Sequence, residues 1–274
     1  IALVGPGASP SRMEWCVVRY GGNGAYTAHT GTWYNHRGNV FTHDCAPVLK
    51  SCTFEHSGHY GLYSRWASNP VIENCTFRNS PWGIVVEDDA FQSAAGTPRV
   101  RNCIITQNTR AGWIHAEALS QFDANNIVSG NVSNGLRVYG SDIVNESATW
   151  RRMMGTPTIV IEGTVRVPAG KTLTITQNNV IKFTSGSRLY SFGTLLAMGS
   201  DGNRIYFTSE KDDSVDGDTN ADGAGSAPSP GDWNSILFSG AESSGSLLRN
   251  CTVRYGAAGS YDAQPGYWLT HNRA

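Results

Sequence analysis

The chain begins to repeat itself after 235 residues. Its last 39 residues align without a gap on its first 39, and 15 of the aligned positions are identical. The longest shared run, Val18–Gly21, returns as Val253–Gly256. Self-similarity at a fixed offset is the signature of a repeat architecture. The sequence therefore predicts one period, plus an overlap, of a longer tandem array.

A shorter repeat lies inside the long one. Short apolar segments recur at intervals of 23, 28 and 23 residues, and each carries Cys, or Asn in the last copy, at the same place: Cys52, Cys75, Cys103 and Asn126. A Gly and a second short apolar stretch follow each of them. Strands this short bury their apolar faces only by stacking on the next copy. The pattern predicts an all-β chain folded as a parallel β-solenoid.

Two stretches carry a family resemblance. The first is residues 74–84, in which Asn-Cys-Thr-Phe is followed by Asn-Ser and then by Gly-Ile. The second is residues 170–209. Both resemble the right-handed parallel β-helix repeat proteins of bacterial secreted and cell-surface proteomes, and the resemblance covers nearly the whole chain. It implies a right-handed parallel β-helix located outside the cell or at its surface. It implies no single function, because lyases, hydrolases, tailspikes, adhesins and passive stalks share the architecture.

The pattern is interrupted once, between residues 146 and 157. In the family, segments like Gly170–Ile175 often open a β-helix. We therefore expect residues 1–148 to form the C-terminal coils of one module and residues 149–274 to begin the next.

The charge of the chain excludes two classes of partner, and its cysteines predict part of its interior. Charged residues make up 16% of the chain, and the net charge is −1. A nucleic-acid or anionic-membrane partner needs a concentrated basic face, and a membrane span needs about 20 apolar residues; the sequence has neither. Five cysteines share one repeat position, so we expect reduced thiols stacked in a row, with Cys45 outside it: Cys16, Cys52, Cys75, Cys103 and Cys251.

The sharpest local motif is acidic and lies within residues 212–232. Asp218, Asn220 and Asp222, followed by Gly223, reproduce the first half of an EF-hand calcium loop, and the second half is missing. We expect a structural Ca²⁺ site formed by Asp216, Asp218, Asn220 and Asp222, with further ligands from Asp212, Asp213, Asp232, carbonyls or water. The alternative is a solvated acidic loop.

A second group of candidates lies on the coil surface. Counting from the repeat Gly brings Arg65 and Trp66 into register with Glu87 and Asp88, and with Glu117. Adjacent coils lie about 4.8 Å apart, so carboxylates on neighbouring coils can reach the separation that a glycosidase uses, with Trp66 and Arg65 binding sugar. Solvated polar turns are the favoured alternative, and we assign no catalytic residue.

Two functions from different classes follow. The favoured one is a structural or adhesive segment of a large extracellular or cell-surface repeat protein, able to form filaments, whose partners are neighbouring β-helix modules or identical chains end to end. The other is a carbohydrate-active enzyme, a polysaccharide lyase or glycoside hydrolase, or a glycan-binding module that holds polysaccharide along the coil surface. The long repeat favours the first, because a rod gains from many copies and an enzyme rarely does.

Overall fold

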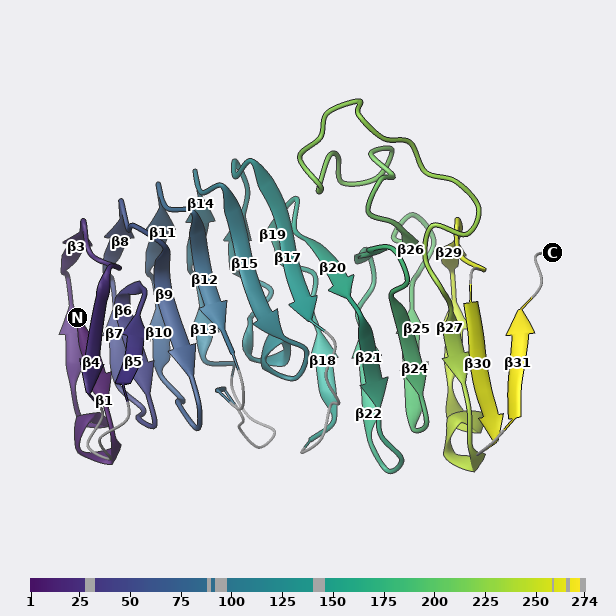
Figure 1. Cartoon of the computed structure of the whole chain (residues 1–274), viewed down its shortest axis with the longest axis horizontal. Coiled ribbons are helices and arrows are strands. Elements are labelled where there is room, and N and C mark those ends of the chain that lie inside the picture. Colours follow the sequence, from purple (N-terminus) through teal and green to yellow (C-terminus); the bar gives the residue numbers. More distant parts are fainter. Residues whose placement is uncertain are drawn as a thin grey trace. The chain divides into compact units, whose positions relative to one another are not determined.

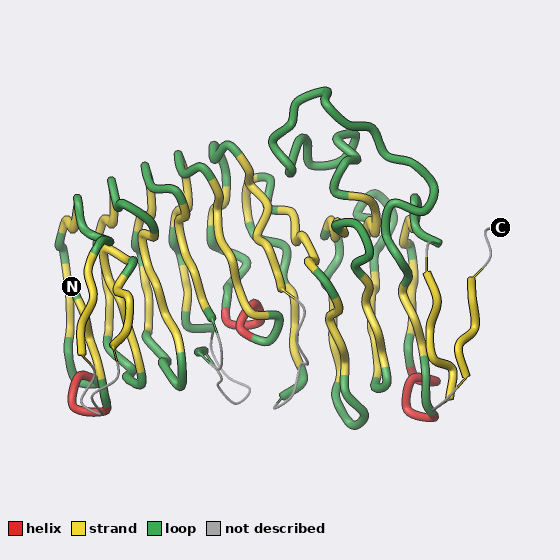
Figure 2. Tube along the Cα trace, in the orientation of Figure 1, coloured by secondary structure: helices red, strands yellow, loops and turns green. Residues whose placement is uncertain are grey.

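The computed structural model describes residues 1–27, 33–87, 90–91, 98–139, 146–257, 259–264 and 267–271. The chain divides into two compact units, residues 1–136 with 153–157 and residues 137–152 with 158–274. The change of unit falls around the segment in which the sequence repeat is interrupted. Figure 2 shows strands and loops in both units, and within the described ranges helix occurs only as short 3-10 turns.

The first unit is a stack of coils, each made of three short strands that pair in parallel with the coils on either side (Figure 1). Its first sheet contains β1 (Ala2–Val4), β6 (Gly38–His43), β9 (Tyr60–Arg65), β12 (Trp82–Val86), β15 (Arg110–His115) and the start of β17 (Ser133–Tyr139). The second contains β2 (Arg12–Glu14), β7 (Val48–Lys50), β10 (Val71–Glu73) and β13 (Val100–Arg101). The third contains β3 (Val17–Arg19), β8 (Thr53–Glu55), β11 (Thr76–Arg78), β14 (Ile104–Thr106), β16 (Ile127–Val128) and β19 (Met154–Gly155).

The corner between the second and third strands of each coil requires a left-handed residue. Asn74 and Asn102 take φ values of 54° and 52° there, which asparagine tolerates better than most residues. The following residue points inward, and this places Cys52, Cys75 and Cys103 in one fully buried row. All six cysteines are free thiols, and Cys16 and Cys251 are half-buried. The predicted row is therefore found for Cys52, Cys75 and Cys103, with Cys16 at the same corner of the first coil. Cys251 instead lies in the strand Cys251–Val253 of the second unit, where it pairs with Ile205, so its predicted place in the row is wrong. The reduced state of the thiols stays a prediction.

Stacked side chains fill the interior. The register places Leu49 on Ile72 and Phe54 on Phe77, and the two phenyl rings are 5.1 Å apart and nearly parallel. All four residues are fully buried. Each coil alone is too thin to shelter such side chains, so the coils stabilise one another through these columns.

A hydrogen-bonded ladder of polar side chains runs along the same stack. The side chains of Ser80, Asn108 and Asn131 each accept a bond from a backbone N–H of the preceding coil, at 3.0–3.1 Å. These residues explain why the sequence repeats Ser or Asn a few positions after each cysteine. The ladder satisfies amide groups that the turns would otherwise bury without partners.

The second unit repeats the same construction, with three parallel sheets built from short strands. One sheet holds β20 (Thr158–Glu162), β23 (Val180–Phe183), β26 (Ile205–Ser209) and β29 (Cys251–Val253). A second holds β21 (Thr164–Val167), β24 (Arg188–Ser191) and β27 (Ile236–Phe238), and a third holds β18 (Ala148–Trp150), β22 (Thr172–Ile175), β25 (Thr194–Met198) and β28 (Leu247–Arg249). The acidic segment follows β26 as a long loop and leads into β27 (Figure 1).

The 235-residue repeat is also a structural repeat. The 3-10 turns η1 (Pro6–Ala8) and η3 (Ala241–Gly245) both follow a Gly of positive φ, 77° at Gly5 and 86° at Gly240. Tyr20 and Tyr255 are both left-handed, with φ of 62° and 64°. Each coil then continues into an antiparallel hairpin, β4 (Gly24–Thr27) with β5 (Trp33–His36) and β30 (Gly259–Gln264) with β31 (Tyr267–His271). The same coil and hairpin therefore occur twice in the chain.

Candidate functional site: an acidic loop and the coil surface

The acidic loop is anchored to the second unit by a buried lysine. Lys182 lies on β23, on the face of the sheet opposite to the interior, yet its side chain is 0% exposed. Its ammonium donates a 2.7 Å hydrogen bond to the carbonyl of Gly217 in the loop. Burial lowers the pKa of Lys182, and the neighbouring loop carboxylates, Asp213 first, act in the opposite direction. The loop therefore covers this face of the sheet and shelters a charge.

Arginine and lysine side chains neutralise three of the carboxylates in and beside the loop. The ion pairs are Arg152–Asp216 at 2.5 Å, Arg254–Asp212 at 2.5 Å and Lys211–Asp232 at 2.8 Å. Burial alone would raise the pKa of Asp212, but hydrogen bonds from Ser214 and Thr208 and the charge of Arg254 outweigh it, and the pKa is lowered. Mutual repulsion among these three carboxylates therefore requires no metal ion to relieve it.

The other three carboxylates converge. One oxygen from each of Asp213, Asp218 and Asp222 lies within 4.8 Å of the others. The backbone N–H groups of Ala221 and Gly223 donate to Asp218 at 2.6 and 2.7 Å, which fixes that carboxylate. Burial and the charge of Asp218 raise the pKa of Asp213. Three oxygens at this spacing suit a hard divalent cation such as Ca²⁺.

Asn220 and Ser226 also contact the cluster, and the Ser226 hydroxyl donates to Asp222 at 2.6 Å. Asn220 makes two further hydrogen bonds. Its Nδ2 donates to Asp222 at 3.0 Å and to Ser226 at 3.2 Å. Its Oδ1 is buried, and no hydrogen-bond partner for it exists among the residues that the structure describes. Of the four predicted metal ligands, the structure thus brings together Asp218, Asn220 and Asp222. Asp216 instead binds Arg152, and Asp213, named only as a further ligand, joins the cluster.

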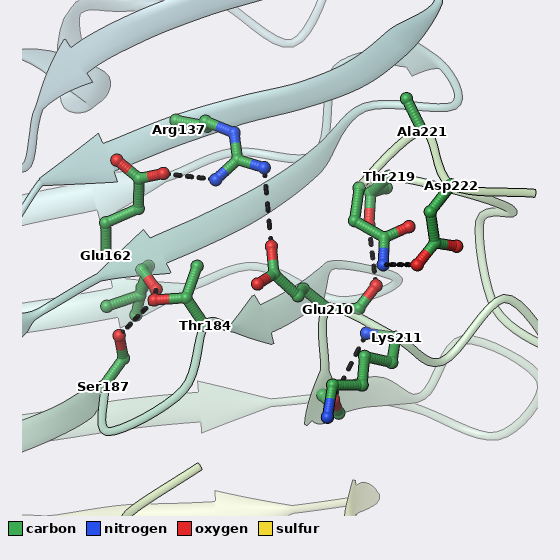
Figure 3. Close-up of polar contacts among 12 residues, drawn as sticks. Arg137, Glu162, Thr184, Ser187, Glu210, Lys211, Thr219, Ala221 and Asp222 are labelled. Atoms are coloured by element: carbon green, nitrogen blue, oxygen red, sulfur yellow. Dashed lines mark hydrogen bonds and ion pairs between the residues drawn. The ribbon is translucent and has the colours of Figure 1, made fainter. Parts of the chain in front are cut away.

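A polar network beside the loop was not anticipated from the sequence (Figure 3). Arg137 on β17 bonds Glu162 at the end of β20 and, at 3.4 Å, Glu210 directly after β26. Burial raises the pKa of Glu210, and Arg137 partly opposes that change. The carbonyl of Glu210 accepts a bond from Thr219, so the network also ties down the loop. Its members come from separate coils, and only the register of the strands aligns them.

Of the predicted coil-surface residues of the first unit, Arg65 and Trp66 contact each other, and Glu87 contacts Tyr63. Tyr63 donates a 2.6 Å hydrogen bond to the carboxylate of Glu87, and the guanidinium of Arg65 lies 5.5 Å from the ring centre of Trp66. Glu117 precedes η2 (Ala118–Gln121) and is buried, which withholds its carboxylate from a polymer on the surface. Asp88, the remaining candidate, lies outside the described residues.

The fold identifies the structural family of this chain. The parallel stack of three-stranded coils is a β-helix, and the chain belongs to the family described as "Right handed beta helix region", whose model matches residues 34–210. Searches of curated proteins and of solved structures found no match. Among the described residues, no helix is long and apolar enough to cross a membrane.

Proposed function

We propose that this chain is a structural segment of an extracellular or cell-surface repeat protein. The observation that carries the proposal is the second occurrence of one coil and its hairpin, 235 residues apart, in both sequence and structure. A solenoid propagates through contacts between neighbouring repeats, so added copies lengthen a rod without any new kind of contact. An adhesive role is compatible with the same rod.

In this proposal the acidic loop stiffens the segment by binding Ca²⁺. Asp213, Asp218 and Asp222 supply carboxylate oxygens, and the buried Oδ1 of Asn220 is available as a neutral ligand. Binding to the folded chain alone raises stability by mass action. The ion would thus make rigidity depend on the calcium outside the cell.

The competing function is carbohydrate turnover on the coil surface. Purified protein is incubated with pectin, alginate, xylan and related polymers, and new reducing ends and unsaturated products are measured. We expect neither product. In a separate measurement, the mass of the native polypeptide should exceed 29.5 kDa by at least one further period of the repeat. Turnover that Glu87→Gln or Glu117→Gln abolishes would establish the enzyme instead. Asp123→Asn, on a turn elsewhere in the first unit, is the matched control.

A further inference from the structure

The acidic loop of the second unit has a fixed base. Asp232, near its end, accepts hydrogen bonds of 2.8 Å from both Ser209 and Lys211, and this ties the end of the loop to its beginning. The next residue, Trp233, is buried and stacks on Phe183 in the interior, with 4.1 Å between the ring centres. The stretch between these anchors can therefore move without disturbing the coils on either side.

That stretch, residues 213–231, is named the lid, because it covers part of the outer face of the first sheet in the second unit. Lys182 and Thr158 point outward from this sheet, yet both are fully buried. The ammonium of Lys182 donates to the carbonyl of Gly217 at 2.7 Å, and the hydroxyl of Thr158 donates to Asp216 at 3.3 Å. Both acceptors belong to the lid, so opening it exposes a cation and a hydroxyl group.

Polar contacts hold the lid closed. Asp216 accepts two hydrogen bonds from the guanidinium of Arg152, at 2.5 and 3.0 Å, and the two side chains are only 14% and 17% exposed. Val215 is the one large apolar residue in the sequence of the lid, and it is half-buried. Segments with few buried apolar contacts open locally at a lower free-energy cost than global unfolding. The lid is therefore expected to open while the coils stay folded.

We propose that the lid opens about its fixed base and that an acidic peptide segment of a partner protein takes its place on the sheet. Opening takes the Asp216 carboxylate away from Arg152 and the Gly217 carbonyl away from Lys182. A ligand shifts the lid to the open state only if it binds that state better than the closed one. The ligand that fits supplies a carboxylate and a backbone carbonyl to these two cations, and an acidic peptide carries both groups.

The charge of the uncovered face also favours an acidic partner. Two further arginines of the second unit keep acidic partners that lie outside the lid, in the pairs Arg254–Asp212 and Arg137–Glu162. The charges that lose lid contacts are those of Arg152 and Lys182. Opening therefore makes this face more positive, which attracts an acidic segment and repels a basic one. The inference goes beyond the proposed function, because it gives the segment a binding partner and a device that controls access to it.

Amine labelling measures the opening of the lid, because the buried ammonium of Lys182 bonds the lid. The chain has three other lysines, and none of them is buried: Lys50, Lys171 and Lys211. The full chain, in chelator, is treated with an acetylating reagent, and each lysine is followed by mass spectrometry. Lys182 should react about tenfold or more faster in Asp216→Asn than in wild type, because the variant loses a charged hydrogen-bond acceptor. Asp201→Asn, in an exposed turn outside the lid, is the matched control.

Binding is measured by fluorescence anisotropy with a dye-labelled synthetic peptide of residues 212–222. Its affinity for Asp216→Asn should exceed its affinity for wild type about tenfold or more, because a larger fraction of the variant is open. Arg152→Gln should open the lid to a similar extent, as labelling of Lys182 will show. It should nevertheless gain no affinity, because the group that binds the peptide carboxylate is gone. A peptide that carries the Asp216→Asn change should bind none of these proteins.

Three results would overturn the proposal. Labelling of Lys182 at the rate of global unfolding in every variant would show that the lid does not open by itself. Equal peptide affinity of wild type and Asp216→Asn would place the peptide elsewhere. Binding of an alginate oligomer instead of the peptide would make the partner an anionic polysaccharide. Circular dichroism establishes that each variant is folded. Both assays run in chelator and measure neither turnover nor chain length, so the lid and the proposed function fail independently.

Discussion

Replacing Asp213 with Asn should make this protein more stable than wild type without calcium and less stable than wild type with calcium. Asp213 accepts no hydrogen bond from the described residues, so the amide loses no hydrogen bond. It removes two of the three repulsions in the cluster and, against them, the attraction between Asp213 and Lys182. Unit charges 4.8 Å apart repel by about 0.9 kcal/mol each in a water-like dielectric. Salt reduces the sum of the two to about 1 kcal/mol. This is an upper estimate, because the variant also loses the attraction to Lys182 and because the unfolded chain retains part of the repulsion.

The assay is thermal unfolding with chelator and with excess calcium, in which 1 kcal/mol corresponds to about 2–4 °C. With chelator, Asp213→Asn should melt above wild type by that amount. With calcium at about 100 times the dissociation constant, wild type should gain about 2.7 kcal/mol and overtake the variant. Asp201→Asn, in an exposed turn, controls for net charge. If wild type melts at the same temperature in both buffers, the cluster binds no calcium, and if the variant gains nothing with chelator, the carboxylates do not converge.

Three further outcomes are expected. Phe77→Ala should lower the free energy of unfolding by about 3–5 kcal/mol in urea, because the fully buried ring sits between two coils that cannot collapse around the cavity. Thiol labelling under denaturing, non-reducing conditions should modify all six cysteines, and a missing thiol would reveal a disulfide. The pKa of Asp212 is lower in the folded state than in the unfolded chain, so this carboxylate stabilises the folded state above about pH 4. That stabilisation is lost as the pH falls through the pKa of Asp212 in the folded state, and protease cleavage of the loop should therefore rise on acidification. Arg254→Gln should move that rise to higher pH.

The fold was predictable because one physical requirement recurs at every coil. Cys52, Cys75 and Cys103 mark the same corner each time, and the preceding Asn or Ser accepts the left-handed backbone that the corner needs. A period of about 23 residues containing short strands has few ways to bury apolar side chains other than stacking. The strands of the second unit obey the same rule with other residues.

The loop was predictable only in part. Alternating oxygens in Asp218, Asn220 and Asp222 are a local signal. The structure brings the carboxylates of Asp218 and Asp222 together, and Asn220 contacts Asp222 through its amide nitrogen. The ion pair of Asp216 could not be predicted from the local sequence, because its partner Arg152 is 64 residues away. Arg137 and Glu210 are 73 residues apart, and their contact depends on strand register that no short motif encodes.

Lys182 couples the acidic insertion to the coil beneath it, because the buried ammonium offsets the charge of the loop carboxylates. Long surface insertions are usually the parts of a protein that relatives shorten or lose. Here the strand carries an ammonium group that donates its hydrogen bond to the carbonyl of Gly217, on a sheet surface where its neighbours are Val160 and Thr208. A loop without this lysine would hold its carboxylates with one fewer positive charge beside them. Lineages that trimmed the loop would therefore be expected to exchange the lysine as well, so the two should be inherited together or lost together.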